Sequence, residues 1–523
     1  MNEKNTENMG LQLLHRGKRG VLRMIFSRMG MIVLLLILQI GLLVSLLMKF
    51  EAFIPHYVAA AMVLNVVMVL YLLNSQADAS VKVTWLVVMT VLPVFGALFY
   101  IFTQSDLGHR ALVNRLHWVQ HQEAGKLKQD PAVVERLEAE NPGAASLSRY
   151  LMRLGFPVYD QTDADYFPSG EAKFEVMLRE LEKAEKFIFL EYFIVDEGLM
   201  WGRILEILAR KAAEGVEVRV MYDGTCEFAL LPHSYPKQLE ALGIQCKVFA
   251  PLSPFVSTHY NYRDHRKILV IDGQVGFTGG VNLADEYINR KERFGYWKDT
   301  AIMLRGGGVQ SLTMLFLQLW SISEQTVVMD PYILPTQAKK PQGYVIPYGD
   351  CPLDADKVGE RVYMDILNRA QHYVHIMTPY LILDGEMEAA LKFAAERGVD
   401  VSLILPGIPD KAMPYALAKT HYRSLLDSGV KIYEFTPGFV HAKVFVADDR
   451  EGVVGTINLD YRSLYHHFEC ASYLYGTDCL KDMENDFQTT VTQCRQVSYE
   501  TIQAEPLGRR LTGFVLKALA PLL

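Results

Sequence analysis

The chain has 523 residues, half of them hydrophobic, and its 52 Lys and Arg against 59 Asp and Glu give a formal net charge of −7. This length exceeds one ordinary hydrophobic core and indicates two or three domains. The acidic balance argues against a general nucleic-acid-binding protein, and the six cysteines lack the spacing of a zinc site or a disulfide framework.

Long apolar segments follow a basic amino-terminal segment at residues 1–28. They run over Met29–Met48, Phe53–Leu73 and Val83–Phe102. About twenty helical residues cover the hydrocarbon layer of a bilayer, so we expect residues 29–103 to be a membrane region with two or three transmembrane helices. The third segment contains Pro93 and Gly96, and a re-entrant or interfacial helix is an alternative there.

Basic residues before the first segment predict a cytoplasmic amino terminus. Three full spans would then place the rest of the chain outside the cytoplasm, whereas two would place it inside. The sequence favours the first arrangement, although the nearly neutral loop from Asn74 to Lys82 adds little to the orientation.

Residues 104–148 are polar and predict a helical linker, after which strands and helices alternate. A strand at Lys186–Val195, a helix at Trp201–Glu214 and a strand at Val216–Tyr222 are followed much later by the same order at 372–380, 386–397 and 399–405. We therefore predict an α/β protein made by internal duplication, with halves at 149–335 and 336–523, each a sheet between helices.

One pattern, His-x-Lys-x-x-x-x-Asp, occurs once in each half. It comprises His265, Lys267 and Asp272 in the first half, and His441, Lys443 and Asp448 in the second. Asn282 and Asn458 each stand 17 residues after the respective histidine. Strand alternation places His and Lys of one copy on one face, so the sequence predicts a single site that both halves build.

These residue types suit the cleavage and re-formation of a phosphodiester. Two lysines and two asparagines can bind the non-bridging oxygens without a metal ion. One neutral imidazole can attack phosphorus while the other, protonated, gives its proton to the leaving alkoxide. The predicted catalytic set is therefore the two motifs, with Lys267, Lys443, Asn282 and Asn458 as phosphate ligands.

Each imidazole also needs an orienting carboxylate, and Asp299 and Glu469 are the candidates. The alternative is that both are ordinary strand-end acids. Within the motifs, Asp272 and Asp448 are expected first of all to hold loops.

The motifs and their surroundings resemble the phospholipase D superfamily, and within it the bacterial cardiolipin synthases. The stretches that carry the resemblance are Asn261–Lys267, Gly276–Asn282, Trp297–Thr300, Thr378–Tyr380, Gly455–Ser463 and Ala520–Leu523. The resemblance implies two tandem phospholipase D-like α-β-α sandwich halves that share one active site. It also implies a multi-pass location in the bacterial cell membrane.

The reaction that the resemblance implies converts two phosphatidylglycerol molecules into cardiolipin and glycerol through a phosphohistidine, with no cofactor. His265 would be the nucleophile and His441 the acid and base. Membrane phospholipids would be the partners, and nothing indicates an oligomeric state. One departure is His467, where relatives commonly carry Asn, and it bears on the choice of headgroup.

Other functions remain as alternatives. The same site could hydrolyse phospholipids or transfer to another alcohol, and a nuclease or a nonenzymatic membrane scaffold is a more distant possibility. The basic, apolar stretch Leu507–Leu523 could lie on an anionic membrane surface or dock on the protein core.

Overall fold

The computed structural model of the chain describes residues 54–75, 77–104, 107–251, 262–354 and 356–520, with five single positions between residues 37 and 45. The predicted basic segment 1–28 lies outside this part. So does the predicted span Met29–Met48, apart from those five positions, as do Asn261 and the last three residues of the chain.

The amino-terminal unit contains α3 (Ile54–Leu73), α4 (Ala79–Val91) and α5 (Pro93–Gln104). The predicted third span is therefore two helices. Pro93 has no backbone N–H and begins a new helix after Leu92. Across the described residues, no helix combines the length and the apolarity needed to cross a membrane, so the expectation of transmembrane helices is not supported.

These three helices pack on one another through a small apolar cluster. Trp85 on α4 lies edge-on to Tyr100 on α5, with ring centres 5.1 Å apart. Gly96 comes so close to α4 that an added Cβ would lie 2.8 Å from the Met89 Cα. The two short helices thus fold back on one another, and Met68 and Leu72 of α3 complete the cluster.

The first half of the duplicated unit is built on a seven-stranded mixed sheet in the order β1-β9-β7-β6-β2-β3-β4. Its strands are β1 (Thr162–Phe167), β2 (Phe187–Tyr192), β3 (Glu217–Asp223), β4 (Gln245–Phe249), β6 (Lys267–Ile271), β7 (Val275–Gly279) and β9 (Ala301–Gly306). Its helices are α9 (Gly170–Leu181), α10 (Leu199–Ala213), α11 (Cys226–Ala229), α12 (Tyr235–Glu240) and α13 (Gly308–Trp320).

The second half repeats this plan in the order β10-β17-β16-β15-β11-β12-β13-β18. Its strands are β10 (Tyr344–Asp350), β11 (Tyr373–Met377), β12 (Asp400–Pro406), β13 (Lys431–Phe435), β15 (Val444–Ala447), β16 (Glu451–Gly455), β17 (His467–Tyr475) and β18 (Cys494–Gln496). Its helices are α14 (Val358–Arg369), α15 (Gly385–Glu396), α16 (Ala412–Asp427), α17 (Tyr461–Tyr465), α18 (Cys479–Val491), α19 (Tyr499–Gln503) and α20 (Leu507–Leu519). The prediction of two tandem α/β halves is confirmed.

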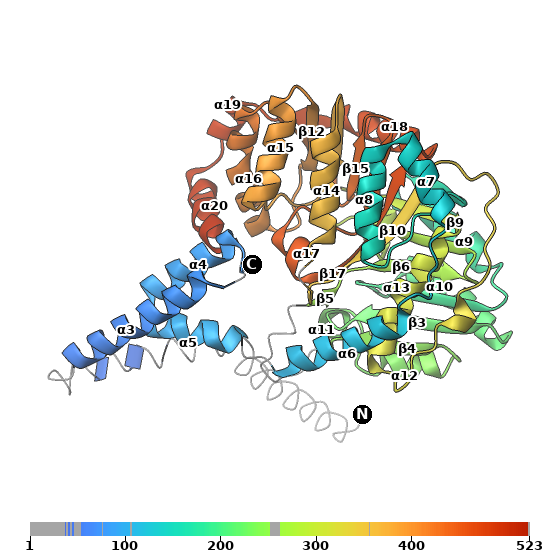
Figure 1. Ribbon diagram of the computed structural model, residues 1–523, viewed down its shortest axis with the longest axis horizontal. Coiled ribbons are helices and arrows are strands. Elements are labelled where there is room, and N and C mark those ends of the chain that lie inside the picture. The colour runs from blue at the N-terminus through green and yellow to red at the C-terminus, as the bar shows by residue number, and fades with distance from the viewer. Residues whose placement is uncertain are drawn as a thin grey trace, which may run out of the picture. The chain divides into compact units, whose positions relative to one another are not determined.

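The two histidine strands alternate between faces, and this alternation builds the core. Ile268 and Val270 of β6 and Val444 and Val446 of β15 all enter one central apolar cluster, which also takes in α13 and α18. The intervening residues of each strand face the outer layers instead. Helices α14, α15 and α16 form the outer layer of the second half (Figure 1). The halves thus share the layer between their sheets.

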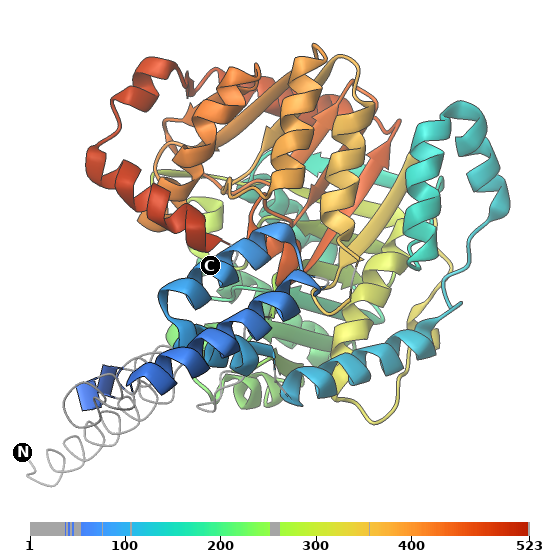
Figure 2. The same cartoon turned by 60° about the vertical axis from the view of Figure 1, so that its left-hand side comes forward.

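The predicted linker at 104–148 is helical, and part of it belongs to the second half. It contains α6 (Leu107–Glu123), α7 (Pro131–Glu140) and the start of α8 (Pro142–Arg153). Leu137, Leu147 and Leu151 are buried in the same apolar cluster as Val362 and Ile366 of α14. Figure 2 shows α7 and α8 standing at the edge of the second sheet.

Candidate active site

The two histidines lie where each half forms a short parallel pairing with a strand of the other half. β5 (Arg263–Asp264) pairs with the start of β17, and β14 (Gly438–Val440) pairs with β8 (Tyr296–Lys298). The pairing continues by one residue: the His265 N–H donates to the Phe468 carbonyl at 2.9 Å and the His441 N–H to the Lys298 carbonyl at 2.7 Å. Each histidine therefore lies beside the residue that comes next in the strand of the other half. This residue is Glu469 for His265 and Asp299 for His441.

That following residue is in each case an acid. His265 Nδ1 lies 2.9 Å and 3.0 Å from the two carboxylate oxygens of Glu469, and His441 Nδ1 lies 2.7 Å from Asp299 Oδ2. A carboxylate accepts, so Nδ1 carries the hydrogen of each ring and Nε2 keeps its lone pair. The structure thus brings the predicted acids and histidines together, with each acid supplied by the half opposite to its histidine.

Both acids are fully buried and held by a further contact. The Thr456 hydroxyl donates to Glu469 Oε2, and the Thr300 N–H donates to Asp299 Oδ1 at 2.8 Å. At the place equivalent to Thr456, the first half has Gly280, which leaves room for the shorter acid. These contacts fix the carboxylates and through them the ring orientations.

The motif lysines lie beside the histidines and are almost fully buried. The Lys267 ammonium donates to the His265 carbonyl, and the Lys443 ammonium to the His441 carbonyl. Burial lowers the pKa of Lys443 to about 7, with Asp299 opposing the shift and Lys267 adding to it. Burial likewise lowers the pKa of Lys267 to about 8. Since the charge of Lys267 acts on the pKa of Lys443, and Asp299 acts on both lysines, the two ammonium groups share one region.

Burial also favours the neutral form of both imidazoles. It holds the pKa of His265 well below its ordinary value, although Glu469 acts in the opposite direction. Burial and Lys443 lower the pKa of His441 to about 4, against the opposing charge of Asp299. Burial acts to raise the pKa of Glu469, but its interactions with His265 outweigh burial and hold that pKa well below its usual range. The site therefore combines an ionised Glu469 with neutral imidazole rings.

The two predicted asparagines differ in their surroundings. Asn282 is engaged at both ends, since its Oδ1 accepts from the Ile194 N–H at 3.0 Å and its Nδ2 donates to the Tyr287 hydroxyl at 2.8 Å. Asn458 Oδ1 is buried without a hydrogen-bond partner among the described residues. Asn282 therefore braces a loop, whereas Asn458 keeps an unmatched polar atom.

Asp272 and Asp448 lie at the far end of the histidine strands. Asp272 accepts three backbone N–H groups, from residues 185, 186 and 187, and Asp448 accepts the three from residues 371, 372 and 373. Both adopt a φ of 53°. This geometry gives both carboxylates an anchoring role, away from the histidines with which the motif groups them.

Sequence reasoning missed a third lysine and several rings around the histidines. Lys173 on α9 is fully buried, and burial lowers its pKa to about 7 while Asp299 opposes that shift. Phe193 packs edge-on against His265 at 4.9 Å between ring centres, and Trp297 and Tyr287 both lie 5.4 Å from His441. Of these residues, only Trp297 could have been placed near His441 from the sequence, because it stands two residues before Asp299.

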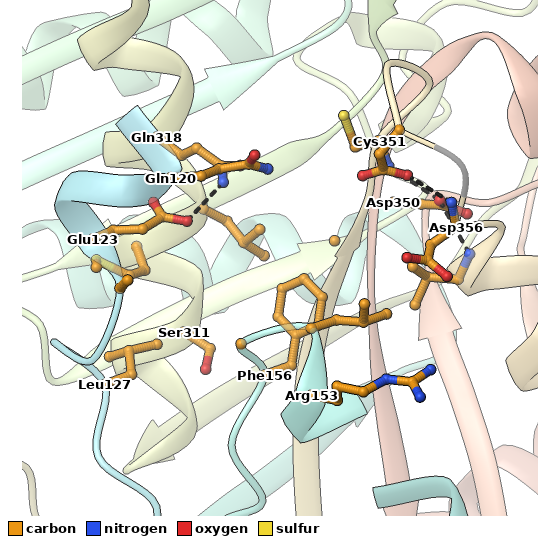
Figure 3. Close-up of a pocket in the computed structure, with 18 of the residues that line it drawn as sticks. Gln120, Glu123, Leu127, Arg153, Phe156, Ser311, Gln318, Asp350, Cys351 and Asp356 are labelled. Carbon is orange, nitrogen blue, oxygen red and sulfur yellow. Dashed lines mark hydrogen bonds between the residues drawn. The ribbon is translucent and has the colours of Figure 1, made fainter. Parts of the chain in front are cut away.

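A separate cavity of about 480 Å³ lies behind the histidine strand. Figure 3 shows Glu123 and Gln318 on one side of it and Asp350 and Asp356 on the other. Arg266 lines this cavity, but the lining residues, all of them in the described part, include none of the predicted site residues. This cavity is thus distinct from the paired histidines.

Comparisons with known proteins show which sequences and folds the chain resembles. A family model described as "Cardiolipin synthase, PLD-like domain" matches residues 177–303 and 363–491, so each match contains one histidine motif. Another, described as "Phospholipase_D-nuclease N-terminal", matches residues 63–103. The chain is 16% identical to a phosphatidylserine synthase from Haemophilus influenzae of known structure, with a TM-score of 0.55 over 73% of this chain and 98% of that one. This likeness supports the fold.

Similar sequences extend over most of the chain. A protein of Streptococcus mutans described as uncharacterized is 58% identical over 87% of this chain and 99% of its own length. A cardiolipin synthase of Geobacillus kaustophilus is 34% identical over 84% of this chain and 88% of its own, and one of Halalkalibacterium halodurans is 31% identical over 95% and 100%. With both halves matched and this identity sustained along its length, the chain belongs to the bacterial cardiolipin synthase family of the phospholipase D superfamily.

Proposed function

We propose that this protein makes cardiolipin by transferring a phosphatidyl group from one phosphatidylglycerol to the free glycerol hydroxyl of a second. The observation that carries the proposal is the pair of buried imidazoles, each oriented by a carboxylate from the opposite half. Family membership supports a phosphatidyltransferase and favours this reaction over hydrolysis.

In the first step, His265 Nε2 attacks phosphorus and the bond from phosphorus to the departing glycerol oxygen breaks. His441 donates a proton to that oxygen, and glycerol leaves. The products of this step are a phosphatidyl-histidine and a neutral His441. Glu469 stabilises the positive charge that develops on the His265 ring.

In the second step, His441 takes a proton from the glycerol hydroxyl of the second phosphatidylglycerol. The resulting oxygen attacks phosphorus, the bond from phosphorus to His265 breaks, and cardiolipin forms. Lys267 and Lys443 stabilise the phosphoryl oxygens in both steps. We assign Asn458 to the same task, because its side-chain N–H groups can donate to a phosphoryl oxygen.

Substrate binding supports the acid role of His441. Burial and Lys443 lower the pKa of His441 to about 4. A phosphodiester anion bound between the lysines would offset their charge and favour protonation of the ring next to Asp299. The anion therefore helps to create the acid that expels glycerol.

The test is product analysis with purified protein and phosphatidylglycerol as the only lipid. Cardiolipin and glycerol are expected, whereas phosphatidic acid and glycerol would establish hydrolysis instead. His265→Ala and His441→Ala should each abolish transfer. His375→Ala is the matched control, because His375 is equally buried and pairs with Glu484 at 2.8 Å outside the site.

The division of labour between the two histidines can be tested separately. A phosphatidyl ester of p-nitrophenol has a leaving group that needs no proton. His441→Ala should form the phosphatidyl-enzyme from this ester at close to the wild-type rate, and His265→Ala should not. The opposite pattern would exchange the two roles.

Membrane association belongs to the same proposal. On α3, Met62, Val63 and Val67 are more than half exposed, and α4 and α5 add further apolar side chains to the exposed surface of the amino-terminal unit. Soluble proteins rarely expose so much apolar surface in one place. We infer that this unit inserts its apolar side chains into the bilayer.

The carboxyl-terminal helix α20 supplies a second contact with lipid. Leu516 and Ala520 are buried in a cluster with Leu417 of α16, so one face docks on the protein. The other face exposes Leu507, Leu511, Phe514 and Val515 next to Arg509, Arg510 and Lys517. The two alternatives for this segment are thus compatible, and we infer that the exposed face lies on an anionic membrane surface.

A further inference from the structure

His467 is a buried imidazole whose ring nitrogens lack hydrogen-bond partners among the described residues. Its exposed fraction is 9%. Buried polar side chains are normally paired, because an unpaired one has lost its water without replacement. A ligand that binds both this ring and its surroundings would remove that cost.

The neighbours of His467 are a histidine and a carboxylate. Its ring centre lies 5.3 Å from that of His265, and its Nδ1 lies 3.6 Å from Glu469 Oε1. The same Oε1 lies 2.9 Å from His265 Nδ1, while Thr456 engages the other carboxylate oxygen. One donor atom from each of the three residues lies within 4.8 Å of the others. Glu469 Oε1 thus lies between the imidazoles of His265 and His467.

We propose that His265, His467 and Glu469 form a binding site for a Zn²⁺-class transition-metal ion, and that the ion blocks the reactive histidine. Zn²⁺ bonds to imidazole nitrogen at about 2.0–2.1 Å and to carboxylate oxygen at about 2.0–2.2 Å. One ion can therefore bridge the 2.9 Å and 3.6 Å separations. Two nitrogens and one oxygen suit Zn²⁺ better than Mg²⁺ or Ca²⁺, which prefer oxygen ligands.

The equivalent place in the other half cannot bind a metal ion. Trp297 stands two residues before Asp299, as His467 stands two before Glu469, and lies 5.4 Å from His441. An indole offers no lone pair for a metal. The pair of His441 and Asp299 therefore repeats the geometry of His265 and Glu469 without the third ligand, and it provides an internal control.

Metal binding and catalysis would exclude one another. When the ion binds the lone pair of His265 Nδ1, the hydrogen of the neutral ring moves to Nε2, so His265 loses both the orienting bond to Glu469 and the Nε2 lone pair that attacks phosphorus. The ring can then no longer attack phosphorus in its set orientation. This inhibitory consequence rests on the proposed function, whereas the metal site itself does not.

The test measures binding of Zn²⁺ alone to untagged, chelator-treated, full-length protein in detergent by titration calorimetry. Wild type should bind one ion that Mg²⁺ does not displace. His467→Asn should weaken this binding by more than about tenfold, as loss of a ligand requires. His441→Asn should leave it unchanged, and circular dichroism checks that both variants fold.

Equal Zn²⁺ affinity in wild type and His467→Asn would overturn the site, and so would a loss of binding in His441→Asn. The inhibitory role is read separately: Zn²⁺ should suppress cardiolipin formation by wild type, EDTA should restore it, and His467→Asn should need at least about tenfold more Zn²⁺ for the same suppression. Binding without inhibition would overturn the inhibitory role. Binding by a protein that makes no cardiolipin under any condition would count against the proposed function and leave the site intact.

Discussion

Gly280 faces Asp299 so closely that a Cβ on residue 280 would lie 2.0 Å from Asp299 Oδ1. In the second half the equivalent residue, Thr456, instead donates its hydroxyl to the longer acid, Glu469. The two halves thus reach the same orientation of a histidine with different combinations of acid and neighbour.

Gly280→Ala should therefore damage catalysis by displacing Asp299 and, with it, His441. We expect transfer to fall by about 10²-fold, the cost of misplacing a reacting group by about 1 Å. Gly202→Ala on α10 is the control, because an added Cβ there meets no heavy atom within 4 Å. Turnover per folded molecule is the measurement, and near-normal turnover of Gly280→Ala would show that His441 does not depend on this contact.

Asp448→Ala should affect stability rather than chemistry. It removes the acceptor of three N–H groups at the start of β11 and places alanine at a φ of 53°, which costs about 1 kcal/mol or more by itself. We expect the free energy of unfolding to fall by about 2–4 kcal/mol. Denaturant unfolding measures this, and transfer per folded molecule should stay close to that of wild type. If the variant folds but is inactive, Asp448 has a catalytic role.

Lys443→Met should stabilise the fold and abolish transfer. Burial lowers the pKa of Lys443 to about 7, so the folded state resists its protonation and the charge destabilises the fold below the ordinary lysine pKa. A buried apolar side chain of similar volume should raise the free energy of unfolding by about 1–4 kcal/mol while abolishing transfer. Thermal unfolding at pH 6 gives the comparison, and a lower melting temperature than wild type would contradict it.

The affinity for a non-reactive phosphodiester anion, measured as its inhibition constant, should fall on the alkaline side because the lysines lose their charge. Lys443 and Lys267, with pKa values lowered to about 7 and about 8, lose their charge as the pH rises through that range. The neutral form of His265 persists far below its ordinary pKa, so this ring should not change the affinity between pH 7 and pH 6. Lys443→Arg should move the alkaline fall to higher pH, because arginine stays protonated. An unmoved fall would assign it to another group.

Phe514→Asp should weaken binding to vesicles that contain phosphatidylglycerol. Phe514 on α20 is 76% exposed, beside basic residues, and an added negative charge would both remove apolar contact and repel the anionic surface. Phe393→Asp on α15 is the matched control, because Phe393 is 54% exposed on the outer helical layer. Vesicle flotation measures binding. Equal loss in both variants would leave α20 without a specific role.

The sequence predicted the duplication and both motifs because these depend on local spacing: His265 and Lys267 are two residues apart on one strand. It could not assign Glu469 to His265 or Asp299 to His441, since that pairing depends on how β5 meets β17 and how β8 meets β14. The break at Pro93 was visible, but whether the following residues continue or fold back depends on the close contact of Gly96 with Met89.

The pairing of each histidine with an acid of the other half also has a consequence during synthesis of the chain. The partner of His265, Glu469, is synthesised 204 residues later, whereas the partner of His441, Asp299, is synthesised 142 residues earlier. An amino-terminal half emerging alone from the ribosome would hold a histidine with no carboxylate to orient it. Such a half would be chemically inert towards the lipids it first meets. Reactivity would begin only when synthesis is almost complete, and a truncated product would do no damage to the membrane.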